Sequence, residues 1–434
     1  MAKLAKHWQP FLLRISLLVL PYQPIASLVG LVVLLVTVFW QHGRAIAQLP
    51  ISRVFLAISL LMILGGFFAY DKPEALLQLA NYLPFFGLFV ALRWLLTRPR
   101  QLEQIAADLV LTAIPLNLIG IVEFALKVLR KLPLSLPDGF QWQLFGWPGP
   151  EEPNRVVSLF IHPNFFAGYL ILVFGLGLGL VLKISDPPVV QRPGLLPATI
   201  AAPTWIMQRK WLIYVGTYLN LAGIFCAGSR NAIAAALLQL LIFSLFLKGR
   251  RTLKLIFLAG MLAIAAGVAV YGFGGRQANL ESFTSDPRVG VWQIALDLIR
   301  QRPWLGWGMG SFKFLYPPRL IDPGYPDIAH PHNFWLLMAT ESGIPVMLTL
   351  TAAIGYFYYR GVRVFISHRL EAAEQAILLG YLLAFGGSIA FSLFDVTLFD
   401  ARINVLNWLT LAGIALFVRQ NDLEYVCKQR LREE

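Results

Sequence analysis

The sequence predicts an all-α polytopic membrane protein, and three observations carry that prediction. Of the 434 residues, 57% are hydrophobic and 14% are charged, whereas roughly a quarter of a soluble domain is charged. Apolar stretches long enough to cross about 30 Å of hydrocarbon recur along the whole chain. The basic residues lie in short clusters between these stretches. We therefore expect one membrane domain over residues 1–434, without a soluble domain of ordinary size.

About twelve transmembrane helices are expected, each from one apolar run. The predicted spans are residues 10–20, 24–40, 52–70, 75–96, 104–127, 164–183, 211–227, 231–247, 253–274, 333–359, 374–394 and 403–418. The first run is short and contains Arg14, so eleven helices is the alternative count. Lys3 and Lys6 precede it as in a signal peptide. Because no small-residue cleavage site follows, we expect these helices to be retained.

The charge clusters predict the topology. With the N-terminus in the cytoplasm, every strong Lys/Arg cluster falls on the inner side of the membrane. These clusters are Lys3 and Lys6; His42, Arg44 and Arg53; Arg93, Arg98 and Arg100; Lys248, Arg250, Arg251 and Lys254; Arg360, Arg363 and Arg369; and Lys428, Arg430 and Arg432. The proline-rich loop 184–210 also falls inside. The outward connections are then 71–74, 131–162, 228–231, 276–332 and 395–402.

The large outward loop, residues 276–332, contains a predicted helix of its own. Asp286 and Pro287 are typical of an N-cap followed by proline in the first turn. Apolar residues then recur at helical spacing: Val291, Ile294, Ala295, Leu298 and Ile299. We expect a short amphipathic helix at the membrane surface. Gly306, Gly308 and Gly310 follow, but no strand precedes them, so they do not indicate a dinucleotide site.

Histidines stand where this loop returns to an apolar run. His330, His332 and Asn333 occupy that return, and a neutral imidazole at His332 can accept a proton near pH 7. The alternative is a polar cap on a membrane helix. His162 also falls on the outward side and could bind zinc with His330 and His332. Because no fourth ligand is evident, we expect no metal and no other cofactor.

Two arginines lie at predicted helix starts on the outward side. Arg230 follows the tight turn Gly228–Ser229, and Arg288 lies in the first turn of the loop helix. A cation at a helix start opposes the helix dipole, which suggests a bound anion. Two guanidinium groups suit a diphosphate, because each binds phosphate oxygens bidentately. The alternatives are a snorkelling side chain at Arg230 and an exposed surface charge at Arg288.

Other ionisable residues have open roles. Glu341 falls inside a predicted span, where it either orients the site or has a buried structural role. Asp395, Asp400 and Arg402 either line the same cavity or pair with one another, and we favour pairing. The net charge of +13 is spread over topology clusters, so we expect membrane lipids and no nucleic acid as partners. Cys226 and Cys427 fall on opposite sides, so no disulfide is expected.

Several motifs together resemble the bacterial O-antigen ligase family, which shares a membrane domain with O-antigen polymerases. His332 and Asn333, then nine residues, then Gly343 are similar to the family's histidine motif. Residues 288–292 and 302–306 resemble its large periplasmic loop. Gly228–Arg230 and His162–Asn164 resemble two further elements. The likeness is strongest over residues 155–346.

Two features depart from the ligase pattern. Val346 stands where the ligase motif usually has Gly, Thr or Tyr, which favours the superfamily more than the ligase branch. The segment Ser392–Asp395 extends the likeness to cyanobacterial members once described as bicarbonate transporters. A cyanobacterial-like member is therefore the expectation.

The resemblance implies a metal-independent glycosyltransferase of the bacterial cytoplasmic (inner) membrane, with its active site facing the periplasm. The donor would be a glycan on undecaprenyl diphosphate, and the acceptor a lipid, a glycan or a protein. His332 would be the general base, Arg230 and Arg288 would bind the diphosphate, and His330, Asn333, Glu341 and His162 would support the site.

Two other functions compete. Transport of a small anion such as bicarbonate would require ionisable residues near the middle of the membrane, whereas here most cluster at one face. A structural membrane subunit without chemistry would not require the loop helix or arginines at helix starts.

Overall fold

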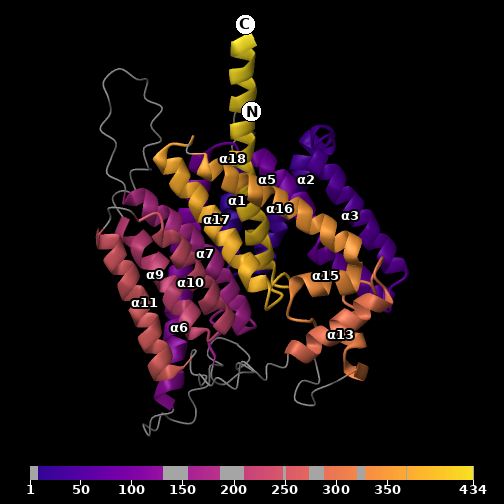
Figure 1. Cartoon of the computed structure of the whole chain (residues 1–434), viewed down its shortest axis with the longest axis horizontal. Helices are drawn as coiled ribbons and strands as arrows, with labels where there is room; N and C mark the ends of the chain where they lie inside the picture. The colour runs from indigo at the N-terminus through magenta and orange to yellow at the C-terminus, as the bar shows by residue number, and fades with distance from the viewer. Residues whose placement is uncertain are drawn as a thin grey trace. The chain divides into compact units, whose positions relative to one another are not determined.

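The computed structural model describes residues 8–130, 155–185, 210–247, 251–272, 288–319, 328–367 and 369–433. Within these residues the chain is helical and contains no strand (Figure 1), which confirms the predicted fold class. Residue contacts divide the chain into two compact units. The first unit comprises residues 1–98, 279–370 and 389–434, and the second comprises residues 99–278 and 371–388.

Most helices of the first unit overlap the predicted spans. They are α1 (Trp8–Val19), α2 (Pro24–Ala47), α3 (Pro50–Phe67), α4 (Lys72–Gln78), η1 (Leu79–Asn81), α5 (Leu83–Leu95), α13 (Arg288–Gln301), α14 (Phe312–Leu315), η3 (Pro317–Arg319), α15 (Phe334–Ser342), α16 (Ile344–Ile366) and α18 (Ala401–Glu433). The predicted span 75–96 is broken between α4 and α5, because Pro84 in the first turn of α5 cannot continue a preceding helix.

The predicted span 333–359 is wrong as a single helix. Gly343 separates α15 from α16 with φ of 84°, a conformation that only glycine adopts without strain. A Cβ on this residue would lie 2.1 Å from the carbonyl oxygen of Trp304. The break therefore lets the loop after α13 pack directly against the backbone between α15 and α16.

The second unit contains α6 (Pro99–Arg130), α7 (Pro163–Ile184), α9 (Lys210–Cys226), α10 (Arg230–Ser244), α11 (Arg251–Tyr271) and most of α17 (Ala372–Ser392). Glycines let α7 and α17 touch backbone to backbone. A Cβ on Gly179 would meet the Cα of Gly380 at 2.6 Å, the close approach that small residues allow between membrane helices. The start of α7 lies at the predicted element His162–Asn164, where His162 is the N-cap.

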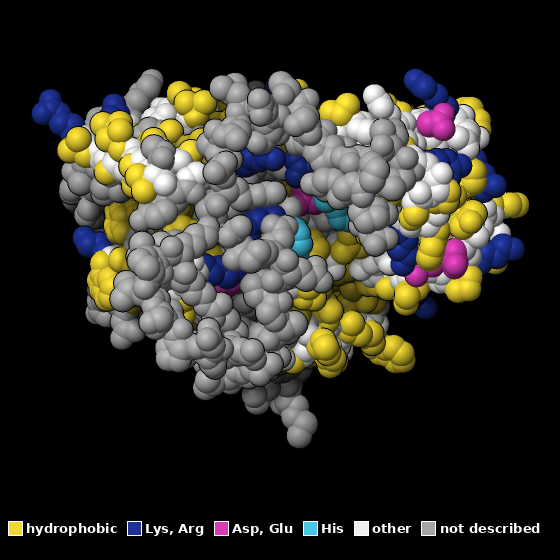
Figure 2. Space-filling model, turned by 90° about the horizontal axis from the view of Figure 1, so that it is seen from below, with side chains coloured by type: hydrophobic (Ala, Val, Ile, Leu, Met, Phe, Trp, Pro, Cys, Tyr) yellow, Lys and Arg dark blue, Asp and Glu magenta, His cyan; other side chains and the backbone are white. Residues whose placement is uncertain are grey.

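Among the described residues, seven helical stretches are long and apolar enough to cross a membrane, so the predicted count of twelve is not confirmed. They are Pro24–Ala47, Pro50–Phe67, Lys72–Leu95, Pro99–Lys127, Pro163–Ile184, Ala372–Ser392 and Ala401–Leu423. Helix α10 is apolar but has only 15 residues, about 22 Å. Figure 2 shows groups of exposed hydrophobic side chains on the described surface, as expected of helices that face lipid.

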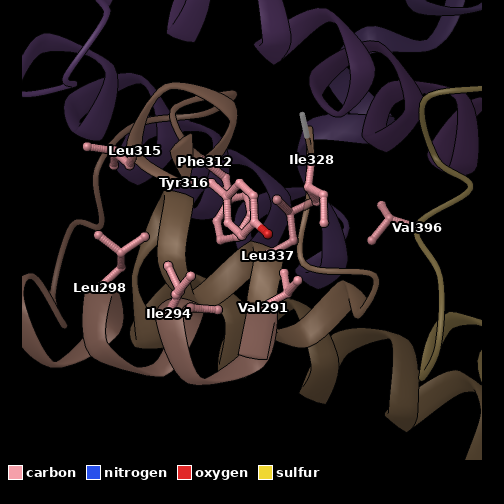
Figure 3. Packing of buried hydrophobic residues seen from close by; sticks show 10 residues of the cluster. Val291, Ile294, Leu298, Phe312, Leu315, Tyr316, Ile328, Leu337 and Val396 are labelled. Atoms are coloured by element: carbon pink, nitrogen blue, oxygen red, sulfur yellow. The ribbon is translucent and has the colours of Figure 1, made fainter. Parts of the chain in front are cut away.

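The loop helix exists as predicted. Helix α13 buries Val291, Ile294, Ala295, Leu298 and Ile299, the same five residues that the sequence pattern selects. Figure 3 shows most of these side chains packed against residues of α14, α15 and the 393–400 segment. The apolar stripe assigned to a membrane surface is therefore covered by protein. Asp286 and Pro287, residues 186–209 of the predicted loop 184–210, and residues 131–154 lie outside the described residues.

Candidate functional site

His332 lies in the connection that leads into α15, with φ of 50°. Asn333 is the N-cap of α15, because its side chain accepts a hydrogen bond from the Leu336 amide at 3.0 Å. The same side chain donates from Nδ2 to the carbonyl of Leu393 at 3.0 Å. One asparagine thus caps α15 and holds the 393–400 segment beside His332.

The 393–400 segment brings a carboxylate to His332. Nδ1 of His332 lies 3.3 Å from Oδ1 of Asp395, and Asp395 is only 3% exposed. Burial raises the pKa of Asp395, but the His332 hydrogen bond and charge, the charge of His330 and the Val396 amide outweigh this effect. The pKa of Asp395 therefore falls well below its usual value, and the group is an anion at neutral pH.

The charge of Asp395 sets the tautomer of His332. A carboxylate accepts hydrogen bonds but cannot donate them, so Nδ1 of the neutral ring must carry the proton. Nε2 then carries the lone pair and can act as a base. The Asp395–His332 pair is a ring oriented by a carboxylate, the arrangement used to fix a catalytic histidine.

His330 packs on His332 in a T-shaped arrangement, with 4.7 Å between ring centroids. Its Nδ1 accepts a weak hydrogen bond from the His332 amide at 3.3 Å. Donor atoms of His330, His332 and Asp395 lie within 4.8 Å of one another, a ligand set that suits a transition metal. Because both Nδ1 atoms already have partners, a metal ion would have to displace these contacts or bind through Nε2.

Helix α13, which begins at Arg288, contacts residues 330–332, here called the histidine segment. Nε1 of Trp292 donates to the carbonyl of Pro331 at 2.8 Å, so the helix is tied to the residue between the two histidines. Arg288 is one turn before Trp292, and residues four apart lie on the same helix face. The partly buried Arg288 therefore lies on the face of α13 that contacts the histidine segment. Figure 2 shows histidine side chains visible at this end of the molecule, next to an acidic one.

Glu341 accepts hydrogen bonds from the backbone of the loop between α13 and α14 and from the start of α14. Its side chain is 1% exposed, and Oε1 accepts from the Phe312 amide at 3.2 Å. Its carbonyl accepts from the Gly308 amide at 2.9 Å. Gly306 packs against the same backbone, because a Cβ there would meet the Glu341 carbonyl carbon at 2.5 Å. The glycines predicted not to bind a dinucleotide thus form a close-packed loop around Glu341.

Arg230 and His162 belong to the second unit. Arg230 is the first residue of α10, directly after the N-cap Ser229, as the sequence predicts. Nδ1 of His162 accepts from the Asn164 amide at 3.1 Å and caps α7. The buried Arg155, which no sequence motif singles out, donates to the Ala227 carbonyl at 3.1 Å and also contacts Asn164.

Arg155 connects the two second-unit elements. It joins the turn before Arg230 to the start of α7, and Nζ of Lys127 donates to its carbonyl. The sequence shows Arg155 only as a cation in the predicted outward connection 131–162, and its partners cannot be inferred from spacing. Of the three residues expected to pair with one another, Asp400 and Arg402 do so at 2.5 Å, whereas Asp395 contacts His332.

Comparison with known proteins identifies one family. Residues 215–351 match the family described as O-antigen ligase, and this range includes Arg230, Arg288, His330, His332, Asn333 and Glu341. His162 and Asp395 lie outside it. Among curated proteins none matches the chain. The match to the O-antigen ligase family therefore covers the segment that carries both candidate arginines and the candidate base.

Proposed function

We propose that this protein is a membrane glycosyltransferase that moves a glycan from undecaprenyl diphosphate to an acceptor hydroxyl. The acceptor is a lipid, a glycan or a protein, and the reaction takes place at the periplasmic face of the bacterial inner membrane. One observation carries the proposal: His332 lies in the matched O-antigen ligase segment with its ring held by the buried Asp395.

In the proposed reaction, Nε2 of His332 takes the proton of the acceptor hydroxyl. The acceptor oxygen attacks the anomeric carbon, and the bond from that carbon to the diphosphate oxygen breaks. The electron pair leaves with undecaprenyl diphosphate. Asp395 stabilises the imidazolium that forms, as a carboxylate does for a catalytic histidine.

Arg288 and Arg230 bind the diphosphate in this proposal. Guanidinium groups stay charged at any working pH and match phosphate oxygens bidentately, so they neutralise the charge that develops on the leaving group. Both stand at helix starts, where backbone amides add donors. The transfer therefore proceeds without a metal ion. Lysine at either position should rescue poorly, because it replaces a planar fork with a point charge.

The proposal is tested by replacing the base. His332→Ala should lower glycan transfer by roughly 10²–10⁴-fold, while binding of the lipid-linked donor is retained. The matched control is His42→Ala. His42 lies near the end of α2, in a basic cluster predicted to face the cytoplasm, and its ring contacts Trp94. Full transfer by His332→Ala would remove this residue from the mechanism. Equal losses in both variants would show a general effect on folding.

A further inference from the structure

A basic cavity lies at the end of α16 and α18, away from the histidine segment. Its volume is about 380 Å³, in the range of small-molecule sites. The polar residues that line it are Tyr359, Arg360, Arg363, Ser367, Arg369 and Asn421. All of them belong to the first unit.

The charge in this cavity is strongly one-sided. The lining contains three guanidinium groups and, among the described residues, no carboxylate. Arg360 donates to Asp422 at 2.5 Å, which offsets one positive charge. Arg363 donates to the hydroxyl of Tyr359 at 3.2 Å, a neutral partner. Like charges that share a concave surface repel one another, so an anion between them is strongly favoured.

The cavity lies about one bilayer thickness from the candidate site. Helix α18 runs from Ala401, beside the 393–400 segment, to Asn421 at the cavity, and its 20 steps of 1.5 Å give about 30 Å. Helix α16 runs alongside it from Ile344 to Arg363, about 28 Å. Figure 1 shows α13 and α15 at the lower end of these helices and the far end of α18 at the top. Because hydrocarbon is about 30 Å thick, the cavity and Asp395 lie at opposite membrane surfaces.

The surroundings of the cavity favour a lipid as occupant. Tyr356 and Tyr359 are 50% and 57% exposed beside it, and Ile366 and Leu423 are 60% and 61% exposed. Exposed tyrosines next to exposed aliphatic side chains are typical of the interface between hydrocarbon and head groups. An occupant with a phosphate and attached acyl chains would contact both the arginines and these apolar side chains.

We propose that this cavity binds the phosphate group of an anionic phospholipid at the membrane surface opposite the candidate catalytic site. Arg363 and Arg369 hold the phosphate oxygens, and Ser367 and Asn421 supply neutral hydrogen bonds to the head group. Basic pockets between membrane helices recognise such head groups in the same way. The binding is independent of the chemistry proposed at His332.

The test measures the unfolding midpoint of the full-length protein in detergent after addition of lipid. Phosphatidylglycerol should raise the midpoint more than the zwitterionic phosphatidylcholine. In Arg363→Gln/Arg369→Gln the affinity for phosphatidylglycerol should fall by about 25-fold, from about fivefold for each arginine removed. The matched control, Arg53→Gln/Arg100→Gln, removes two exposed arginines that do not line the cavity and should respond like the wild type.

Native mass spectrometry of the same three proteins counts the bound phosphatidylglycerol directly, so a lowered starting midpoint in the double variant does not obscure the result. Equal lipid retention by the double variant and the control would overturn the proposal. Inorganic phosphate forms the second arm. If phosphate alone stabilises the wild type as well as phosphatidylglycerol does, and the double variant loses this effect, the cavity takes a soluble anion and the lipid assignment is wrong.

Discussion

Replacement of Asp395 tests the orientation of the proposed base. Asp395→Asn keeps the shape of the side chain but removes its charge, so the charge-assisted hydrogen bond to Nδ1 of His332 is lost. Such bonds contribute about 1.5–3 kcal/mol. The 3.3 Å separation lies at the long end of hydrogen-bond distances, which favours the lower value. A loss of about 1.5 kcal/mol corresponds to roughly a tenfold fall in kcat.

The assay follows release of undecaprenyl diphosphate from the glycan donor over a range of pH, with Asp297→Asn as the matched control. Asp297 is an exposed carboxylate on α13 that contacts Gln301, so its variant should keep full activity. Unchanged kcat in Asp395→Asn would show that the carboxylate does not orient His332, and the reasoning from the contact would be refuted.

The pH profile gives a second readout of the same prediction. Because the pKa of Asp395 is lowered in the folded protein, its stabilising contribution is present above the unfolded pKa of about 4 and is lost only as the pH falls through the lowered value. Asp395 therefore stays ionised between about pH 5 and 9. An acid limb of the wild-type profile in that range should persist in Asp395→Asn. Its disappearance would show that Asp395 titrates there.

Three further predictions follow from the described geometry. In a cysteine-free background, Ile161→Cys and Trp304→Cys should react with an impermeant thiol reagent in spheroplasts, because these positions are 90% and 75% exposed on the predicted outer side. Ser367→Cys, on the predicted inner side, should not react. The reverse labelling pattern would show that the topology is inverted. Gly343→Ala should lower the free energy of unfolding by about 3 kcal/mol or more, because it adds strain at positive φ to a backbone clash. Gly355→Ala is the control, and it should leave the unfolding midpoint nearly unchanged because there is open space around its Cβ. Glycan transfer should survive EDTA, and loss of transfer that only a divalent metal restores would show a metal-dependent enzyme.

The helices could be predicted from the sequence because their apolar runs and basic flanks are local signals. The stripe of α13 is the clearest case, since all five residues at helical spacing are buried. The break at Gly343 was missed because it lies inside an apolar run, and its cause is the Trp304 carbonyl 39 positions earlier. Contacts of this kind depend on tertiary packing and leave no periodic signal.

In the candidate site, too, local features could be predicted from the sequence and long-range contacts could not. The sequence singled out His332 and Arg288, and the structure places both on elements that contact each other through Trp292 and Pro331. From the sequence, Asp395 is expected either to line the cavity or to pair with Asp400 and Arg402. In the structure its carboxylate contacts His332, which lies 63 residues earlier in the chain. Such a partner cannot be inferred from spacing along one chain.

The most direct test of the central claim reconstitutes the purified protein in liposomes with glycolipids extracted from the membranes of the source cells. Undecaprenyl diphosphate is then quantified by mass spectrometry in the presence of EDTA, for the wild type and for His332→Ala. The proposed transferase predicts that the wild type releases undecaprenyl diphosphate and extends an acceptor, and that His332→Ala does so at least 100-fold more slowly, as expected for loss of a general base. Uptake of bicarbonate by the same liposomes, without release of undecaprenyl diphosphate, would contradict the claim and identify a transporter.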